Sequence, residues 1–158
     1  MPTVEILLNK MRVVIQRSKK ATVTIEEKVH GSIDHGMVIL LGIEHEDDRS
    51  DADWLIQKIL GLRIFSDDEG KMNLSIAETR GSILLISQFT LHASTKKGNR
   101  PSFIKAARPE QAIPLYEYFI EQLGHHIHVE TGAFGADMQV ASINDGPVTI
   151  IIDSKQKE

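Results

Sequence analysis

Four consecutive residues that could bind or activate a substrate stand where an apolar segment of the chain ends. Residues 82–91 read SILLISQFTL, and the apolar first half predicts a buried strand. Polar groups at the end of such a strand need hydrogen-bond partners. One interpretation is a site for a substrate carbonyl or ribose, with backbone N–H groups as an oxyanion hole; the other is a strand end capped by polar residues. The candidate catalytic residues of this SQFT segment are Ser87, Gln88, Phe89 and Thr90.

Two glycine-containing segments could bring backbone groups close to a ligand. Gly146 and Pro147 lie in the sequence NDGP between two apolar runs, a composition typical of a turn. The bond before a proline is also the kind of peptide bond that can be cis. The segment 130–138, ETGAFGADM, places glycines around Phe134, where a flat ligand could approach the backbone. The alternatives are a simple turn at Gly146 and Pro147 and a loop without a ligand at 130–138.

Familiar catalytic and metal-binding signatures fail in this chain. The S-x-x-K match at residues 94–97 lies in a basic loop rather than at the start of a buried helix, so we attribute it to chance. His125, His126 and His128 have neither an HExxH spacing nor a cysteine partner, which favours an exposed strand start over a zinc site. The chain also lacks a phosphate-binding GxxxxGK, a dinucleotide fingerprint and a GxSxG elbow. We therefore expect no metal and no cofactor.

Charge is distributed unevenly along the chain. The net charge of −4 argues against a protein that coats nucleic acid over its whole surface. Residues 92–109, however, contain five cations and no acidic residue, so the remainder of the chain carries −9. This basic stretch is a candidate phosphate-binding segment, with a solvated lysine-rich loop as the alternative. Its cations are Lys96, Lys97, Arg100, Lys105 and Arg108.

Length and composition predict a single domain. The 158 residues, 41% of them hydrophobic, suffice for one sizeable core. The absence of cysteine excludes a disulfide scaffold and a cysteine nucleophile. With neither a signal peptide nor an apolar run long enough to span a membrane, we expect a soluble cytoplasmic protein.

Hydrophobic periodicity predicts a β-rich α/β chain with two helices. A first helix should begin near Ser50, with Ser50 and Asp53 as a capping box. A second helix is expected at residues 109–123, although Pro114 suggests that it starts late. The strongest strand is 82–91, and 66–73 reads as a loop. The other expected strands are 12–17, 21–25, 37–43 (covered on both faces), 136–143 and 148–153.

Six motifs taken together resemble the D-aminoacyl-tRNA deacylases, also called the D-tyrosyl-tRNA deacylase family. The motifs MRVVIQR, LRIFSDDEGKMNLS, SQFTL, KKGNRPSF, VETGAFGADM and NDGPVT occur in that order. SQFTL and NDGPVT at this separation are highly specific. The resemblance predicts a deacylase domain at residues 11–153, a short polar tail at 154–158 and an extension of unassigned role at 1–10.

The resemblance implies one compact domain of layered, barrel-like β-sheets with two helices on one side, assembled as a two-fold homodimer. Active sites would lie at the subunit interface, where the SQFT segment forms one wall. Gly146 and Pro147 would form a cis pair that reaches into the partner's pocket, and Arg17 would hold that pair across the interface. Thr149, Phe134 and Met138 would join the substrate site, the last two beside the terminal adenosine. Lys96, Lys97 and Arg100 would contact the tRNA.

The implied activity is proofreading hydrolysis of the ester of D-aminoacyl-tRNA, with rejection of L-aminoacyl-tRNA. Backbone oxygens would collide with the Cβ of an L residue, whereas glycine has no Cβ, so glycyl-tRNA mischarged on tRNA(Ala) is an expected second substrate. The resemblance points to the 2′-hydroxyl of the terminal ribose assisting the water, with Thr90 as a nucleophile as the alternative. A non-catalytic tRNA- or RNA-binding module and a histidine-based metallohydrolase are the competing hypotheses.

Overall fold

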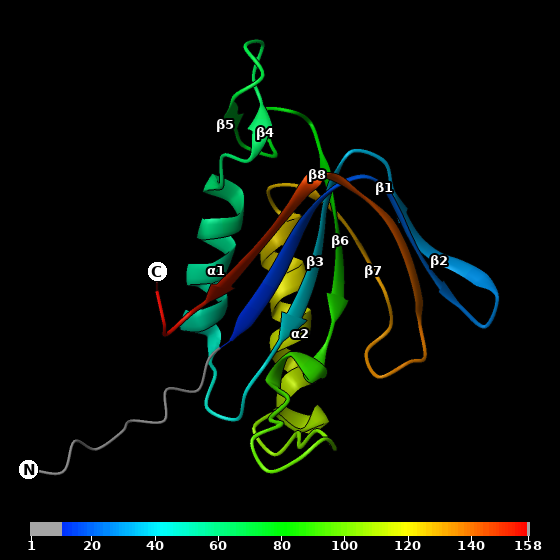
Figure 1. Ribbon diagram of the computed structural model, residues 1–158, viewed down its shortest axis with the longest axis vertical. Coiled ribbons are helices and arrows are strands. Elements are labelled where there is room, and N and C mark those ends of the chain that lie inside the picture. The colour runs from blue at the N-terminus through cyan, green and yellow to red at the C-terminus, as the bar shows by residue number, and fades with distance from the viewer. Residues whose placement is uncertain (1–10, 158) are drawn as a thin grey trace, which may run out of the picture.

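The computed structural model describes residues 11–157, so the expected extension at 1–10 lies outside the described residues. Figure 1 shows a curved sheet beside two helices. The elements, in chain order, are β1 (Arg12–Ile25), β2 (Lys28–Ile33), β3 (Gly36–Gly42), α1 (Arg49–Gly61), β4 (Phe65–Ser66), β5 (Met72–Leu74), β6 (Ser82–Ser87), the 3-10 helix η1 (Phe89–His92), α2 (Pro109–Gly124), β7 (His128–Thr131) and β8 (Gln139–Asp153).

The main sheet is nearly closed. Its strand order is β2-β1-β3-β6-β7, and β8 pairs with β1. β1 runs antiparallel to β2, β3 and β8, while β3, β6 and β7 are parallel. His30 Nδ1 on β2 lies 2.8 Å from the Thr131 carbonyl oxygen on β7, which brings the ends of the sheet path together. The expected barrel-like, β-rich domain is confirmed.

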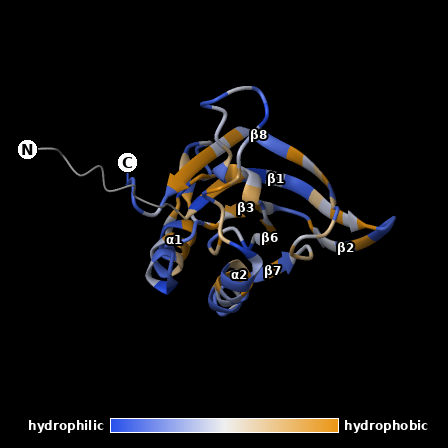
Figure 2. Cartoon of the chain, turned by 90° about the horizontal axis from the view of Figure 1, so that it is seen from below, coloured by the Kyte–Doolittle hydropathy of each residue, from blue (hydrophilic) through white to orange (hydrophobic). Residues whose placement is uncertain are grey.

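Both helices pack against the same side of the sheet, as Figure 2 shows, and this arrangement was also predicted. Leu55 and Ile59 of α1 and Phe119 of α2 are fully buried with residues of β1 and β3 such as Ile15 and Ile39. A second apolar cluster fills the other face, where Val38 of β3 lies among buried residues of β1, β2 and β6. β3 is therefore covered on both faces, as its density of apolar residues predicted. Within residues 11–157, no helix is long and apolar enough to cross a membrane.

The predicted break between two N-terminal strands is wrong, because β1 continues through Ser18 and its neighbours as one strand of 14 residues. The Ser18 hydroxyl is buried and donates to the Lys20 carbonyl at 3.0 Å. The pairing of β1 with β8 shifts register on both sides of Ser18. The polar residues thus mark an irregularity in a long strand rather than a turn.

The two last strands are likewise one strand, β8. Pairing with β1 runs from Gln139 to Asn144, skips four residues and resumes at Thr149, opposite Gln16. Residues 145–148 therefore bulge out of the ladder without reversing the chain, so the expected hairpin-like turn is replaced by an excursion within a strand. The strand predicted at 82–91 is shorter than expected, because β6 ends at Ser87 and η1 follows.

Both helices are present, but the details of their starts differ from the predictions. The capping box of α1 consists of Asp48 and Asp51 rather than Ser50 and Asp53, and the Asp48 side chain accepts from the Ser50 N–H at 2.9 Å. α2 begins at Pro109 and continues through Pro114, so the late start is wrong. The segment 66–73 is not all loop, because it contributes to the small β4–β5 hairpin. His128 is the first residue of β7 and is exposed, so the predicted exposed strand start is confirmed.

Candidate functional site

The SQFT segment begins at Ser87, the last residue of β6. The N–H of Gln88 still donates to the Leu41 carbonyl of β3 at 2.8 Å, and the chain then turns into η1 at Phe89. Ser87 and Gln88 are half-buried, whereas Phe89 and Thr90 are exposed, Phe89 to 53%. The first N–H groups of a helix have no acceptor within it, which leaves those of Phe89 and Thr90 available to a substrate oxygen. This geometry suits an oxyanion hole.

A cavity of about 270 Å³ brings the SQFT segment together with the GAFGADM loop. Ser87, Gln88 and Phe89 line one side of it, and Phe134 and Met138 line the other. These two segments lie more than forty positions apart in the chain, and β6 and β7 bring them together as parallel neighbours. Five of the predicted site residues therefore share one cavity, whereas Thr90 is not among its lining residues.

Phe134 packs against Tyr116 of α2, a residue that sequence reasoning did not single out. The two ring centroids are 5.9 Å apart, and the Tyr116 hydroxyl donates to the Leu85 carbonyl at 3.3 Å. Burial raises the pKa of Tyr116 to about 12, so the hydroxyl keeps its proton at neutral pH. Gly132 matters for the same wall, because a Cβ there would overlap the sulfur of Met138.

The second group of predicted residues surrounds the bulge of β8. The Gly146–Pro147 peptide bond is cis, as the resemblance implied. Arg17 Nε donates to the Asp145 carbonyl at 2.8 Å, and Arg17 Nη1 donates to the Ile64 carbonyl at 2.7 Å. Arg17 thus ties the bulge to the segment before β4. Both contacts lie within one chain, and the role of Arg17 across a subunit interface stays a prediction.

Asn144 holds the bulge from the other side. Its side-chain carbonyl accepts from the Val148 N–H at 2.7 Å, and its amide donates to the Thr149 hydroxyl at 3.1 Å. Thr149 therefore supports the bulge and does not line the cavity of the SQFT segment. Sequence reasoning treated Asn144 only as a turn residue. The signal for its role is the known preference of asparagine side chains for nearby backbone N–H groups.

The two groups of residues lie apart in the molecule. In Figure 1, β8 bends in the upper part of the molecule, below the β4–β5 hairpin, whereas β6 points down toward the segment that follows it. Gly146 and Pro147 are absent from the lining of the cavity. One copy of the chain, over residues 11–157, therefore does not bring the cis pair to the SQFT segment.

Few titratable groups lie near the candidate site. Among the described residues that line the cavity, Asp137 alone is titratable. The Thr90 hydroxyl accepts a hydrogen bond from the Gln88 amide, which cannot act as a base. The next histidine, His92, is buried with its Nδ1 2.9 Å from Glu44 Oε1, and burial lowers the pKa of His92. The geometry offers water activation by oriented dipoles rather than a nucleophile–histidine pair.

The histidines considered for zinc lie apart from this cavity. His128 Nε2 pairs with Glu130 Oε2 at 3.0 Å on the exposed side of β7. Within residues 11–157, no three histidine, aspartate or glutamate side chains are grouped as a metal would require.

The predicted basic stretch forms a loop that directly follows η1. Ser94 and Ser102 exchange two backbone hydrogen bonds of 2.8 Å, and these close the loop at its base. A second cavity of about 270 Å³ lies in it. Its cationic lining consists of Lys96, Lys97, Arg100 and Lys105, while Arg108 lies outside it as the N-cap of α2.

Comparison with known proteins gives a consistent result. Residues 14–153 match the family model described as D-Tyr-tRNA(Tyr) deacylase. A protein of Cytophaga hutchinsonii described as D-aminoacyl-tRNA deacylase is 62% identical over 150 residues, which cover 94% of this chain and 100% of the relative.

Solved structures are similar over nearly the whole chain. One titled "c-Myc DNA Unwinding Element Binding Protein" is 41% identical with a TM-score of 0.85, covering 90% of this chain and 97% of the other. A second, titled as a probable eukaryotic D-amino acid tRNA deacylase, has a TM-score of 0.75 at 16% identity, covering 91% of this chain and 99% of the other, which supports the fold alone.

Proposed function

The chain belongs to the D-Tyr-tRNA(Tyr) deacylase family, and we propose that it hydrolyses the ester bond of D-aminoacyl-tRNA to release the D-amino acid and tRNA. The observation that carries the proposal is the cavity shared by the SQFT segment and the GAFGADM loop, in a chain 62% identical to a protein described as a deacylase. In this assignment Ser87, Gln88, Phe89 and Thr90 receive the ester, and Phe134 and Met138 contact the terminal adenosine.

Chiral selection comes from the backbone carbonyl groups of Gly146 and Pro147. An L residue would drive its Cβ into these oxygens, whereas a D residue directs its side chain away from them. Such rejection needs no pocket for a particular side chain, so the enzyme accepts many D-amino acids. Glycine has no Cβ to exclude, and glycyl-tRNA mischarged on tRNA(Ala) is therefore a second substrate. Arg17 and Thr149 keep the bulge in place through the hydrogen bonds described above.

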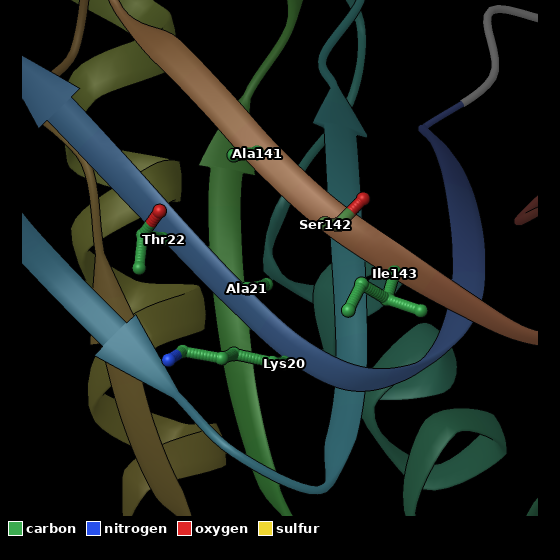
Figure 3. A pocket seen from close by; sticks show the side chains of 6 residues that line it. All are labelled: Lys20, Ala21, Thr22, Ala141, Ser142 and Ile143. Atoms are coloured by element: carbon green, nitrogen blue, oxygen red, sulfur yellow. The ribbon is translucent and has the colours of Figure 1, made fainter.

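The active enzyme is a two-fold homodimer with its sites at the subunit interface. The separation of the bulge from the SQFT segment supports this assembly, because a second copy can supply the missing wall. Exposed apolar side chains of β8 offer a surface for contact, since Ile143 is 56% and Ile151 64% exposed. Figure 3 shows the residues of β1 and β8 that line a pocket, namely Lys20, Ala21, Thr22, Ala141, Ser142 and Ile143.

Hydrolysis proceeds by attack of a positioned water on the ester carbonyl. An aminoacyl ester is already activated, so orientation and stabilisation of the oxyanion by the N–H groups of Phe89 and Thr90 supply the main contributions. The 2′-hydroxyl of the terminal ribose assists the water. Thr90 lacks a base that would make it a nucleophile, since its hydroxyl is paired with Gln88.

The tRNA is contacted by three cations of the basic stretch: Lys96, Lys97 and Arg100. The deacylase domain comprises residues 11–153, and the protein is cytoplasmic. The polar tail assigned to 154–158 is anchored at its start, because the buried Ser154 hydroxyl donates to Asp51 Oδ1 at 2.8 Å.

The first test is hydrolysis of matched D- and L-tyrosyl-tRNA by the purified protein, with and without a strong chelator. We expect rapid release from the D ester only, unaffected by the chelator. Inertness toward both esters, in a folded protein that binds tRNA, would favour a non-catalytic RNA-binding module. Loss of activity on chelation would favour a metallohydrolase.

A further inference from the structure

The basic loop at residues 94–105 has the features of a binding site for single-stranded nucleic acid. We infer that it binds the unpaired 3′ strand of the substrate, upstream of the esterified adenosine, with phosphodiester groups in its cavity. The inference rests on the proposed deacylase function and adds the part of the tRNA that this loop contacts.

The cations of the loop are available to an external anion. Lys96, Lys97, Arg100 and Lys105 line one cavity, and within residues 11–157 none of the four forms a salt bridge with a carboxylate. By contrast, Arg12 is paired with Asp153 at 2.7 Å and Lys71 with Glu69 at 3.5 Å. Because residues 92–109 contain no acidic side chain, the positive charge of this loop is not neutralised locally. A phosphate group would therefore meet a preformed positive site.

The same cavity has an apolar wall. Ile104 lines it and is 81% exposed, the largest exposed fraction among the large hydrophobic residues described. Duplex phosphates require cations but no apolar surface, since the bases of a duplex are stacked inside. Unpaired bases expose their faces and pack on apolar or aromatic side chains beside a positively charged groove. The combination of four cations with an exposed isoleucine thus favours a single strand over the acceptor duplex.

The loop also adjoins the proposed ester site. Phe103, next to Ile104, packs edge-on against Phe89 with ring centroids 5.0 Å apart and an interplanar angle of 77°. Phe89 lines the cavity of the SQFT segment. The chain just after the loop is tied to the residue that follows β3, because the Ala107 N–H donates to the Ile43 carbonyl at 2.9 Å. A strand whose last nucleotide occupies the ester site would therefore reach the loop with the nucleotides immediately before it.

The test uses D-tyrosyl esters of increasing length: adenosine, the trinucleotide CCA, a minihelix and whole tRNA. The variant Lys97→Ala/Arg100→Ala is compared with Lys28→Ala/Lys58→Ala, which removes two exposed lysines outside the loop. We expect the loop variant to raise KM at least about fivefold for the trinucleotide and by a similar factor for tRNA. For the adenosine ester, which has no phosphodiester, the KM of the loop variant should be close to the wild-type KM. The slope of log KM against log salt should fall by about 0.7 for each phosphate that the variant no longer binds.

Two results would overturn the inference. The first is an unchanged KM for the trinucleotide with a raised KM only for substrates that contain a duplex, which would assign the loop to the acceptor stem. The second is an equal effect from the control variant. Fluorescence anisotropy with a labelled, non-acylated CCA oligonucleotide measures the same binding without hydrolysis. A protein that binds this oligonucleotide through the loop but releases no D-tyrosine would refute the proposed function and leave the inference standing.

Discussion

At the scale of single residues, some side chains of the candidate site could be predicted from the sequence and others could not. The SQFT segment could be predicted as a candidate site because its polar residues end an apolar strand. Phe134 and Met138 became selectable through glycines that mark close approach of the backbone. Tyr116 behind Phe134 was not selectable, because its hydroxyl partner is a carbonyl of β6 and no local pattern encodes that contact.

Gly146 occupies a position where a side chain has no room. Its φ of +145° is one that residues with a Cβ rarely adopt. A Cβ there would lie 2.8 Å from Val148 Cγ2, 3.0 Å from the Val148 nitrogen and 3.2 Å from Arg17 Nη2. We expect Gly146→Ala to displace the bulge, to reduce the rate on D-tyrosyl-tRNA at least about tenfold and to destabilise the fold by about 1–3 kcal/mol.

Hydrolysis assays on D- and L-tyrosyl-tRNA measure the effect of Gly146→Ala on the reaction, and urea unfolding measures its effect on stability. Gly124→Ala is the matched control, because a Cβ at Gly124 meets nothing within 4 Å. A Gly146→Ala enzyme with the wild-type rate and D/L ratio would show that the bulge does not select chirality.

Thr90 provides the second test at this scale. Its hydroxyl is exposed and hydrogen-bonded to the amide of Gln88, which cannot remove its proton. If the 2′-hydroxyl of the substrate assists the water, Thr90→Ala should retain kcat within about tenfold of wild type. A substrate that ends in 2′-deoxyadenosine should instead lose most activity. Single-turnover kinetics of Thr90→Ala with the normal substrate, and of the wild type with the 2′-deoxy substrate, separate the two routes. Complete loss of hydrolysis in a folded Thr90→Ala protein would favour the threonine nucleophile.

At the scale of elements, periodicity located both helices and the buried strand β3, but it failed where polar residues interrupt a strand. β1 and β8 each continue through such an interruption, because each has a neighbouring strand that pairs on both sides of it. Local composition cannot report a pairing such as that of Ser18 with Asn144, whose partners lie far apart in the chain. The capping box of α1 was misplaced for a different, local reason: the aspartates and the serine near its start fit the motif at more than one register.

A buried carboxylate at the start of α1 gives a stability prediction for this element. Asp47 is buried, and desolvation, together with the charges of Asp51 and Glu44, raises its pKa to about 7. A carboxyl whose folded pKa exceeds its unfolded value stabilises the fold most below the unfolded value of 3.8, and this contribution is lost as pH rises through about 7. Above pH 7 the ionised Asp47 should therefore weaken the fold.

Replacement by Asn removes this charge and can keep the acceptor for the Glu44 N–H, which lies 2.7 Å from Asp47 Oδ2. We expect Asp47→Asn to raise the free energy of unfolding by about 1–3 kcal/mol at pH 8 and by little at pH 3, where this carboxyl is largely protonated in both the folded and the unfolded protein. Urea titrations at the two pH values measure the difference. Equal effects at both would mean that Asp47 ionises normally, with Lys155, 3.7 Å away, neutralising it.

At the scale of the whole molecule, the sequence could not show that the cavity and the bulge lie apart within one chain. Their separation follows from the long path of β8 along β1, which carries Gly146 away from the loop that contains Phe134. Resemblance to a family supplied the idea of a shared interface. The geometry supplies a reason for it, because each of two copies would hold one wall of each site.

Mixed dimers test this arrangement directly. Gln88→Ala damages the SQFT wall and Gly146→Ala damages the bulge, so each variant alone should have little activity. If the two walls of a site come from different chains, a dimer of one variant with the other contains one intact site and one doubly damaged site. Random exchange of equal amounts makes about half of the dimers mixed, so activity should recover to about one quarter of wild type. Recovery requires subunit exchange, which size-exclusion chromatography of differently labelled variants can verify. Exchange without recovery would place both walls in the same chain and would refute the shared site, since no other route restores an intact pair of walls.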